Sequence, residues 1–132
     1  MTDYAAYFDE VIQAHEAIER WFAVDQDDAA LEHLLTRFSP AFSMVSPLGR
    51  ALDFEALAAL FRMAGGKKHG FRIELSELRG IAWHERGATV TYRERQTDAS
   101  GLHSDRRATV VFDRAESGRV VWRHLQETFC AE

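Results

Sequence analysis

Apolar residues in the first part of the chain follow a helical spacing. Between residues 4 and 22 they recur at three- and four-residue steps, which is typical of an amphipathic helix. The members of this predicted face are Tyr4, Phe8, Val11, Ile12, Ile18 and Phe22. Thr2 or Asp3 can cap this helix. The polar run at 25–28 breaks the helical spacing, and within it Asp27 or Asp28 can cap a second, shorter helix. The second helix carries Leu31, Leu34, Leu35 and Phe38, and it is predicted to end at Ser39-Pro40.

A short strand and a third helix come next. Alternation over 42–46 predicts the strand, and Pro47 and Gly49 predict a sharp turn after it. Asp53 can cap the third helix, and Gly65-Gly66 ends it in the way that glycine commonly ends a helix. The predicted apolar face of this helix consists of Phe54, Leu57, Leu60 and Phe61.

Four long, strand-like stretches make up the second half of the chain. They predict strands over 71–78, extending through 83 with a bulge at Gly80, and over 88–97, 104–113 and 120–129. Glycine-containing loops join these strands as hairpins. Helices followed by a meander of strands predict an α+β fold in which three N-terminal helices pack into the concavity of a bent antiparallel sheet. The length of 132 residues fits a single domain, 1–132, because domains typically span roughly 100–200 residues.

Composition and charge narrow the functional classes. Hydrophobic residues make up 46% of the chain and charged residues 28%, which is ordinary for a globular protein. The formal charge of -5 repels phosphate backbones, so no nucleic-acid partner is expected. The short basic pairs at 67–68 and 106–107 are expected to be solvated. Because the N-terminal segment is acidic and no apolar stretch reaches membrane-spanning length, we expect a cytoplasmic protein without a membrane partner.

The sequence contains no pattern for metal or cofactor binding. Cys130 is the only cysteine, so an intrachain disulfide is excluded. The histidines show neither His-x-His nor His-x-x-x-His spacing, and Gly65-Gly66 ends a helix instead of preceding one. We therefore expect no metal, no cofactor and no phosphate-binding loop.

The order and spacing of these elements resemble the nuclear transport factor 2-like (NTF2-like) superfamily, which includes ketosteroid isomerase and SnoaL-like polyketide cyclases. The most similar local stretches are 42–49, followed by Asp53 and the apolar helix, and 121–128. The resemblance covers nearly the whole chain. It implies a cone-shaped, cystatin-like α+β barrel around an internal pocket, and a homodimer formed through the sheet. It does not imply a particular function.

One catalytic feature of the superfamily can be compared with this sequence directly. In ketosteroid isomerase the proton-shuttling aspartate precedes a Pro-x-Gly turn, which Pro47-Leu48-Gly49 resembles, but the preceding residue here is Ser46. A hydroxyl group cannot act as that base unless another base activates it. No residue of the first helix clearly matches the oxyanion tyrosine of the isomerase either. The resemblance therefore does not carry isomerase chemistry over to this chain.

Strand parity selects candidate residues for the pocket wall, because residues two apart share a face. In the strand over 88–97, Tyr92, Glu94 and Gln96 are predicted to point inward, whereas Arg93 and Arg95 face water or an interface. Ala108, Val110 and Phe112 are predicted to point inward from the next strand. The predicted wall opposite Glu94 consists of Leu57, Phe61, Phe71 and Phe112.

On this basis Glu94 is the main polar anchor of the pocket. Burial of a carboxylate among apolar walls disfavours its charged form and predicts a raised pKa. Glu94→Gln is expected to weaken ligand binding without unfolding the domain. Two plainer interpretations remain open: Glu94 is hydrated at the mouth of the pocket, or it pairs with Arg106 on the neighbouring strand.

Both faces of the last strand mix polar and apolar residues, so parity alone does not orient it. The family resemblance implies that Leu125, Glu127 and Phe129 point inward, and that Trp122 and His124 lie on the outer face at a dimer interface. His124 and Glu127 can both face the pocket only if a bulge intervenes. His15, on the apolar face of the first helix, is interpreted as a hydrogen-bonded core residue.

Three functions are compatible with these features. The first is binding of a small, largely apolar molecule in the internal pocket, with no cofactor. The second is a SnoaL-like or isomerase-like enzyme with an inward carboxylate, Glu94 or Glu127, as acid or base. The third is a dimeric interaction module whose pocket is filled by side chains. The predicted ligand-binding residues are Tyr92, Glu94, Gln96, Phe61, Phe112 and Glu127.

Overall fold

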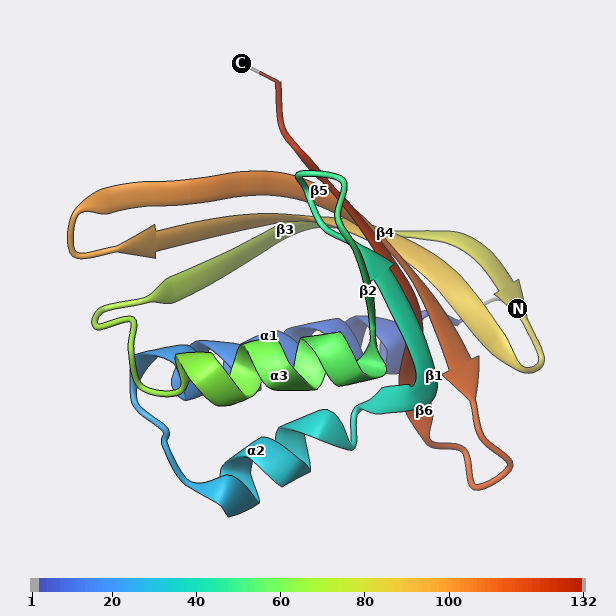
Figure 1. Ribbon diagram of the computed structural model, residues 1–132. Coiled ribbons are helices and arrows are strands. Elements are labelled where there is room, and N and C mark those ends of the chain that lie inside the picture. Colours follow the sequence, from blue (N-terminus) through green and yellow to red (C-terminus); the bar gives the residue numbers. More distant parts are fainter. Residues whose placement is uncertain (1–2, 132) are drawn as a thin grey trace.

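Within residues 3–131, which the computed structural model describes, three helices lie on the concave side of a curved six-stranded sheet (Figure 1). The first and third helices pack against the sheet, and the second packs against these two helices. The helices are α1 (Ala5–Ala23), α2 (Asp28–Leu35) and α3 (Phe54–Ala64). The strands are β1 (Phe38–Val45), β2 (Ala51–Asp53), β3 (Arg72–His84), β4 (Gly87–Asp98), β5 (Gly101–Arg114) and β6 (Val120–Phe129). The predicted α+β fold, with helices first and long strands last, is confirmed.

Aspartates satisfy backbone donors at the helix starts, as the sequence predicts. The Ala29 amide donates to the carboxylate of Asp27 at 2.8 Å at the start of α2, and the Ala56 amide donates to Asp53 at 2.9 Å at the start of α3. Just before α1, the Asp3 carboxylate accepts a hydrogen bond from Ala5. The alternative cap, Thr2, lies outside the described residues.

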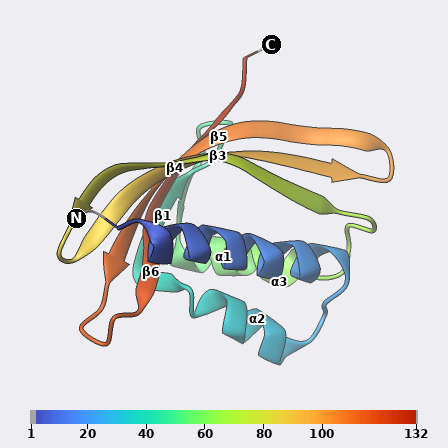
Figure 2. The same ribbon diagram turned by 180° about the vertical axis from the view of Figure 1, so that it is seen from behind.

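The buried face of α1 is rotated relative to the predicted one. Tyr7 and Trp21, which the predicted face omitted, are buried, whereas Ile12 is 38% exposed. The Trp21 indole donates to the carbonyl of Phe61 at 2.7 Å and so ties α1 to α3. Viewed from behind, α1 lies in front of α3, with α2 beside them (Figure 2). This packing leaves His15 on the side of α1 that faces the sheet interior.

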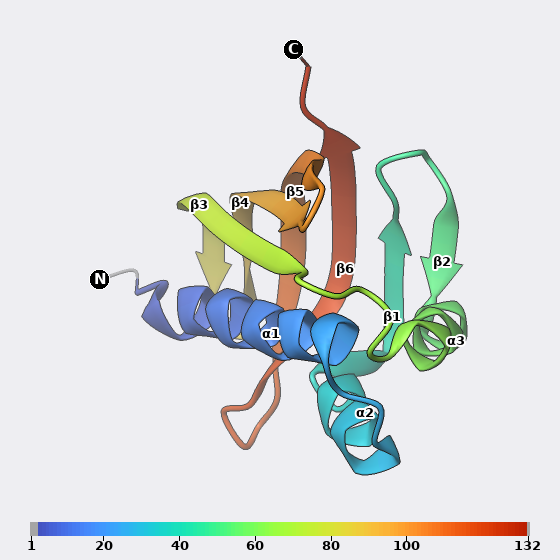
Figure 3. The same ribbon diagram turned by 90° about the vertical axis from the view of Figure 1, so that its left-hand side faces the viewer.

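The sheet is open and mixed, whereas the sequence predicted an antiparallel one. Its strand order is β2-β1-β6-β5-β4-β3, which places the edge strands β2 and β3 at opposite sides of the view in Figure 3. All neighbouring strands are antiparallel except β1 and β6, which run parallel. The short strand β2 was not predicted, and it hydrogen-bonds to β1 at the edge of the sheet.

Strand β1 begins earlier than predicted, because Phe38 belongs to this strand and not to the second helix. Pro40 lies inside β1, and the pairing of β1 with β6 is interrupted between Phe38 and Ser43. Proline has no backbone N–H to donate to a strand ladder, so an interruption at this point is expected. The interrupted pairing lets Phe38 turn into the core, where it is 6% exposed.

A bulge in β6 overturns the predicted placement of Trp122, whereas Leu125 and Glu127 point inward as predicted. Phe112 pairs with Trp122 and Val111 pairs with His124, so Arg123 is an extra residue in β6. The extra residue changes the parity of the strand, and Trp122 and Leu125 both point inward. Trp122 is 2% exposed within this chain, so its placement on an outer dimer interface was wrong. His124 lies partly buried, with its Nδ1 2.7 Å from the hydroxyl of Ser43.

Strand β3 bends over α1 through two irregularities in its pairing with β4, between Ser76 and Arg79 and between Gly80 and Ala82. A bulge at Gly80 was predicted. A side chain at Gly80 would overlap the ring of Tyr4, so any other residue here would require that ring to move away from β3. None of the described helices has the length and apolar character that crossing a membrane requires.

Candidate functional site

A cavity of about 220 Å³ lies between α1, α3 and the concave side of the sheet. Its walls are mainly apolar, with six of the contributing side chains being Phe38, Phe42, Met44, Leu57, Phe61 and Trp122. Leu60 also lines the cavity and is 53% exposed, so the cavity reaches the surface beside α3. The aromatic rings contact one another, with Phe38 5.0 Å from Phe42 and 5.9 Å from Trp122 between ring centroids. Such contacts give the wall a defined shape.

Polar side chains line the cavity in two clusters, and the first joins α1 to β4. Nε2 of His15 lies 3.1 Å from Oε1 of Glu94, and the side-chain amide of Gln96 donates to Oε2 of Glu94 at 2.6 Å. The other ring nitrogen of His15, Nδ1, lies 2.7 Å from the carbonyl oxygen of Val11. A carbonyl oxygen only accepts hydrogen bonds, so Nδ1 carries a proton. One further proton then lies between Nε2 and Glu94, and the pair has no net charge wherever that proton sits.

The contact with His15 reverses the predicted pKa shift of Glu94. Burial alone raises the pKa of this carboxyl, but the charge and hydrogen bond of His15, together with the hydrogen bond from Gln96, lower it to about 2. For His15, burial lowers the pKa, but Glu94 outweighs burial and the net shift is upward. These opposite shifts favour the arrangement in which His15 holds the shared proton and Glu94 is a carboxylate. The prediction of a raised pKa for Glu94 was wrong because it included no partner from α1.

The second cluster lies on β5 and β6. Nη1 of Arg106 donates to Oε1 of Glu127 at 3.2 Å, and Nε and Nη2 of Arg106 donate to the hydroxyl of Ser104 at 3.0 and 2.8 Å. Burial raises the pKa of Glu127, the positive charge of Arg106 offsets this only in part, and the negative charge of Glu94 adds to it, so the pKa is about 6. Of the two inward carboxyls, Glu127 is the one that changes charge near neutral pH.

Comparison with known proteins identifies the family. No family model and no curated protein matches the chain. A solved structure of an NTF2-like protein of unknown function from Pseudomonas aeruginosa is 49% identical to it, covers 96% of this chain and 99% of its own, and superimposes with a TM-score of 0.90. The chain belongs to the NTF2-like family. The predicted resemblance is thereby confirmed.

More distant structures share the fold of this NTF2-like chain. A protein of the NTF2-like family from Streptomyces avermitilis, provisionally named a dehydratase, is 19% identical, with a TM-score of 0.73 over 98% of this chain and 100% of its own. A protein from Novosphingobium aromaticivorans, provisionally named an aromatic ring hydroxylase, is 13% identical, with a TM-score of 0.77 over 98% of this chain and 90% of its own. At these identities the likeness shows the fold alone.

The residues predicted for the site divide into two groups. Glu94, Gln96, Phe61 and Glu127 all line the cavity of the NTF2-like chain, although they come from α3, β4 and β6. Tyr92 and Phe112 are buried in the adjoining core and do not line the cavity. The ring of Tyr92 lies against His15 at 5.3 Å, and the ring of Phe112 lies against Trp122 at 4.9 Å.

Of the predicted wall opposite Glu94, Leu57 and Phe61 line the cavity, whereas Phe71 and Phe112 do not. Phe71 instead packs edge-on against Phe22 at 5.3 Å. Neither plainer interpretation of Glu94 holds, because the residue is 3% exposed and Arg106 makes its ion pair with Glu127.

The cavity residues that were not predicted for the site include His15, Arg106 and Trp122. Arg106 shares its parity with Ala108, which was predicted to point inward, so the sequence contained a signal for it. His15 was interpreted as a core residue, and no pattern in the sequence indicates that it meets a carboxylate 79 residues away. Trp122 faces inward because of the bulge at Arg123, and no glycine or proline in β6 indicates this bulge in the sequence.

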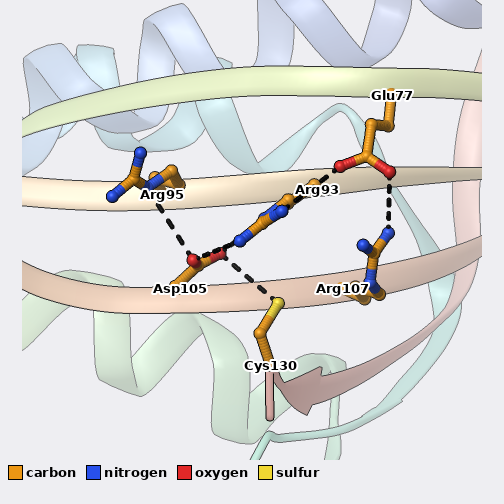
Figure 4. A network of polar contacts seen from close by, with 6 residues as sticks. All are labelled: Glu77, Arg93, Arg95, Asp105, Arg107 and Cys130. Carbon is orange, nitrogen blue, oxygen red and sulfur yellow. Dashed lines mark hydrogen bonds and ion pairs between the residues drawn. The ribbon is translucent and has the colours of Figure 1, made fainter. Parts of the chain in front are cut away.

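The outer face of the sheet carries a separate network of charges, shown in Figure 4. Its members are Glu77, Arg93, Arg95, Asp105, Arg107 and Cys130. Arg93 donates to both carboxylate oxygens of Asp105, at 2.9 and 2.6 Å, and Arg107 donates to Glu77 at 3.0 Å. Strand parity predicted that Arg93 and Arg95 lie on the other face of the sheet from Glu94, and the structure confirms this. These partly or fully exposed charges pair with one another and take no part in the cavity.

Proposed function

We propose that this chain binds a small, largely apolar molecule in the cavity, with the polar end of the ligand against the Glu94 and Arg106–Glu127 clusters. The observation that supports this most is that about 220 Å³ stays open among apolar side chains that line it closely. An engineered apolar cavity of about 150 Å³ is sufficient for benzene. By proportion, this cavity accommodates a ligand of about nine non-hydrogen atoms, or a larger one that extends past Leu60.

The arrangement of polar groups supports a ligand with one polar end. The six polar side chains that line the cavity are His15, Ser46, Glu94, Gln96, Arg106 and Glu127. Five of them, all except Ser46, are joined in the two hydrogen-bonded clusters and are therefore held in fixed positions. Binding sites of this kind combine apolar walls, which supply affinity, with a few placed polar groups, which fix orientation.

Filling the cavity tests this proposal. Leu57→Trp places a larger side chain on the cavity wall, and Leu48→Trp makes the same change on the exposed β1–β2 turn, where Leu48 is 86% exposed. Saturation-transfer NMR with a panel of one-ring compounds is expected to detect binding to the natural chain and to Leu48→Trp, but not to a folded Leu57→Trp variant. Equal binding by both variants would place the ligand elsewhere and contradict the proposal.

A second candidate function is acid–base catalysis by Glu127. The observation that favours it is a pKa of about 6 on a carboxyl group that lines an apolar cavity, since a general base works best when its pKa is near the ambient pH. In such a reaction the Glu127 carboxylate removes a proton from the carbon beside a ligand carbonyl. The adjacent guanidinium of Arg106 stabilises the enolate oxygen, and Glu127 then returns a proton to carbon.

Isotope exchange tests the second candidate without knowledge of the natural substrate. Phenylacetone in deuterated water is expected to exchange its acidic C–H hydrogens faster with the protein than without it, as followed by proton NMR. The rate should rise with pH around pH 6 and should fall to background in Glu127→Gln. If exchange is unaffected by the protein, or is equal in the variant, Glu127 is not a catalytic base for this class of compound.

A further inference from the structure

The charges around the cavity cancel in pairs. Among the residues that the structure describes, the cavity wall carries four ionisable side chains: His15, Glu94, Arg106 and Glu127. His15 and Glu94 share one proton on their hydrogen bond and have no net charge together. Arg106 is always positively charged, and the negative charge of Glu127 balances it only while Glu127 is ionised. An anionic ligand therefore adds an unbalanced negative charge to the cavity unless Glu127 takes up a proton.

Arg106 and Glu127 also present unused hydrogen-bonding capacity side by side. Glu127 Oε1 accepts from Arg106, but no donor to Oε2 lies among residues 3–131. Nη1 of Arg106 carries two hydrogens, and Glu127 Oε1 is the one acceptor it meets within the same residues. An acceptor oxygen and a spare N–H are thus held next to each other, because the two side chains are joined at 3.2 Å.

We infer that the polar end of the ligand is a carboxylic acid, which binds together with one proton that it shares with Glu127, while Arg106 donates to its other oxygen. The inference rests on the proposed function, because it names the class of molecule that enters the same cavity. A protonated carboxyl offers one O–H donor and one carbonyl acceptor, the complement of the free Glu127 oxygen and the free Arg106 hydrogen. A hydrogen bond between a carboxylic acid and a carboxylate is short and strong.

The proton balance follows from the ionisation of the two carboxyl groups. A free carboxylic acid has a pKa of roughly 4, so it reaches the protein at neutral pH as a carboxylate. The complex then takes one proton from solvent, places it between the ligand and Glu127, and returns it when the ligand leaves. Without that proton, two carboxylates would lie against one guanidinium in a buried site, which is costly.

The surroundings of Glu127 favour this uptake. The charged groups that act on it are Arg106 on β5, Glu94 on β4 and His15 on α1. Burial already raises its pKa to about 6, and a bound carboxylate would raise it further by like-charge repulsion. Because the cavity holds about nine non-hydrogen atoms, benzoate, which has nine, is a suitable probe.

Calorimetry with four one-ring probes tests the inference. Benzoate, benzyl alcohol, benzylamine and toluene share the ring and differ in the polar end. At pH 5.5 benzoate is expected to bind most tightly of the four. At pH 7.5, titrations in two buffers of different ionisation enthalpy should show uptake of about one proton per benzoate bound, and the affinity should fall about tenfold for each further pH unit.

Two variants separate the contributions of Glu127 and Arg106 to benzoate binding. Glu127→Gln, whose amide resembles the protonated acid in shape and charge, is expected to keep benzoate binding, to abolish proton uptake and to remove the dependence on pH. Arg106→Gln is expected to lose the preference for benzoate over benzyl alcohol. Circular dichroism checks that each variant is folded, and the measurement of proton uptake on the natural chain needs no variant at all.

The outcomes distinguish this inference from the proposed function. If benzyl alcohol or toluene binds more tightly than benzoate at pH 5.5, the ligand class is wrong but binding in the cavity stands. Benzoate binding without proton uptake at pH 7.5 overturns the role of Glu127. If none of the four compounds binds, both the inference and the proposed function fail.

Discussion

Replacing Glu127 by glutamine should make the protein more stable above pH 6. The pKa of Glu127 is about 6, compared with an ordinary value of 4.5, so ionising this carboxyl is harder in the folded chain than in the unfolded one. At about 1.4 kcal/mol per pKa unit, the difference corresponds to about 2 kcal/mol. The contribution of the protonated Glu127 carboxyl to the free energy of unfolding is fully present below pH 4.5, and it is lost as the pH rises through about 6.

Glutamine at position 127 resembles the protonated, neutral form of Glu127 and stays neutral at every pH. Its carbonyl oxygen can still accept the hydrogen bond from Arg106, and its amide fills the same space as the carboxyl group. The attraction between Arg106 and an ionised Glu127 is already part of the raised pKa, so it needs no separate term. The expected gain is therefore about 2 kcal/mol at pH 8 and close to zero at pH 4.5.

Urea unfolding at pH 4.5 and pH 8 measures this gain. The free energies of unfolding of the natural chain and of Glu127→Gln should differ at pH 8 and converge at pH 4.5. Glu116→Gln, the same change on an exposed turn, is the matched control and should show no difference at either pH. A Glu127→Gln variant that is equal to or less stable than the natural chain at pH 8 would refute the reasoning, because burial would not then be the dominant effect on Glu127.

Three further results are expected. Because the pKa of Glu94 is lowered to about 2, on the order of 3 kcal/mol of stability should be present above pH 4.5 and lost as the pH falls toward 2; urea unfolding between these values should show a flatter dependence in Glu94→Gln. Gly87→Ala should reduce the free energy of unfolding by about 1–3 kcal/mol, since a side chain there would overlap the carbonyl oxygen of Phe112, whereas the exposed Glu85→Ala should have little effect. Light scattering is expected to give twice the chain mass, as the predicted homodimer requires, and a monomer at all concentrations would contradict that prediction.

The secondary structure was largely predictable because its signals are local. An aspartate before an apolar run, a glycine pair after one and alternation between glycine turns each act over a few residues, and they predicted the three helices and four long strands. The two main errors in the sheet have non-local causes. Strand β2 has only three residues and forms by pairing with β1, and the parallel pairing of β1 with β6 joins segments about 80 residues apart. Neither feature leaves a pattern in a short window of sequence.

The candidate site was predictable strand by strand but not across strands. Parity alone brought Glu94 and Gln96 to the inner face, and it would have brought Arg106 there by the same rule. For the last strand, the family resemblance oriented Glu127 correctly, but Trp122 was misplaced because the bulge at Arg123 changes the parity between the two residues. Arg123 is an ordinary residue in a strand, so the bulge depends on how β5 and β6 pair and not on local conformational preference.

The two inward carboxyls show why the direction of a pKa shift needs the tertiary structure. Burial acts on Glu94 and Glu127 alike and raises the pKa of each. Their values nevertheless lie near 2 and 6, because Glu94 receives hydrogen bonds from both His15 and Gln96, whereas Glu127 receives one from Arg106 and is repelled by Glu94. When the surroundings of two carboxyl groups give them different pKa values, the two groups can play different chemical roles. Glu94 is thus suited to hold a fixed charge, and Glu127 to gain and lose a proton near pH 6.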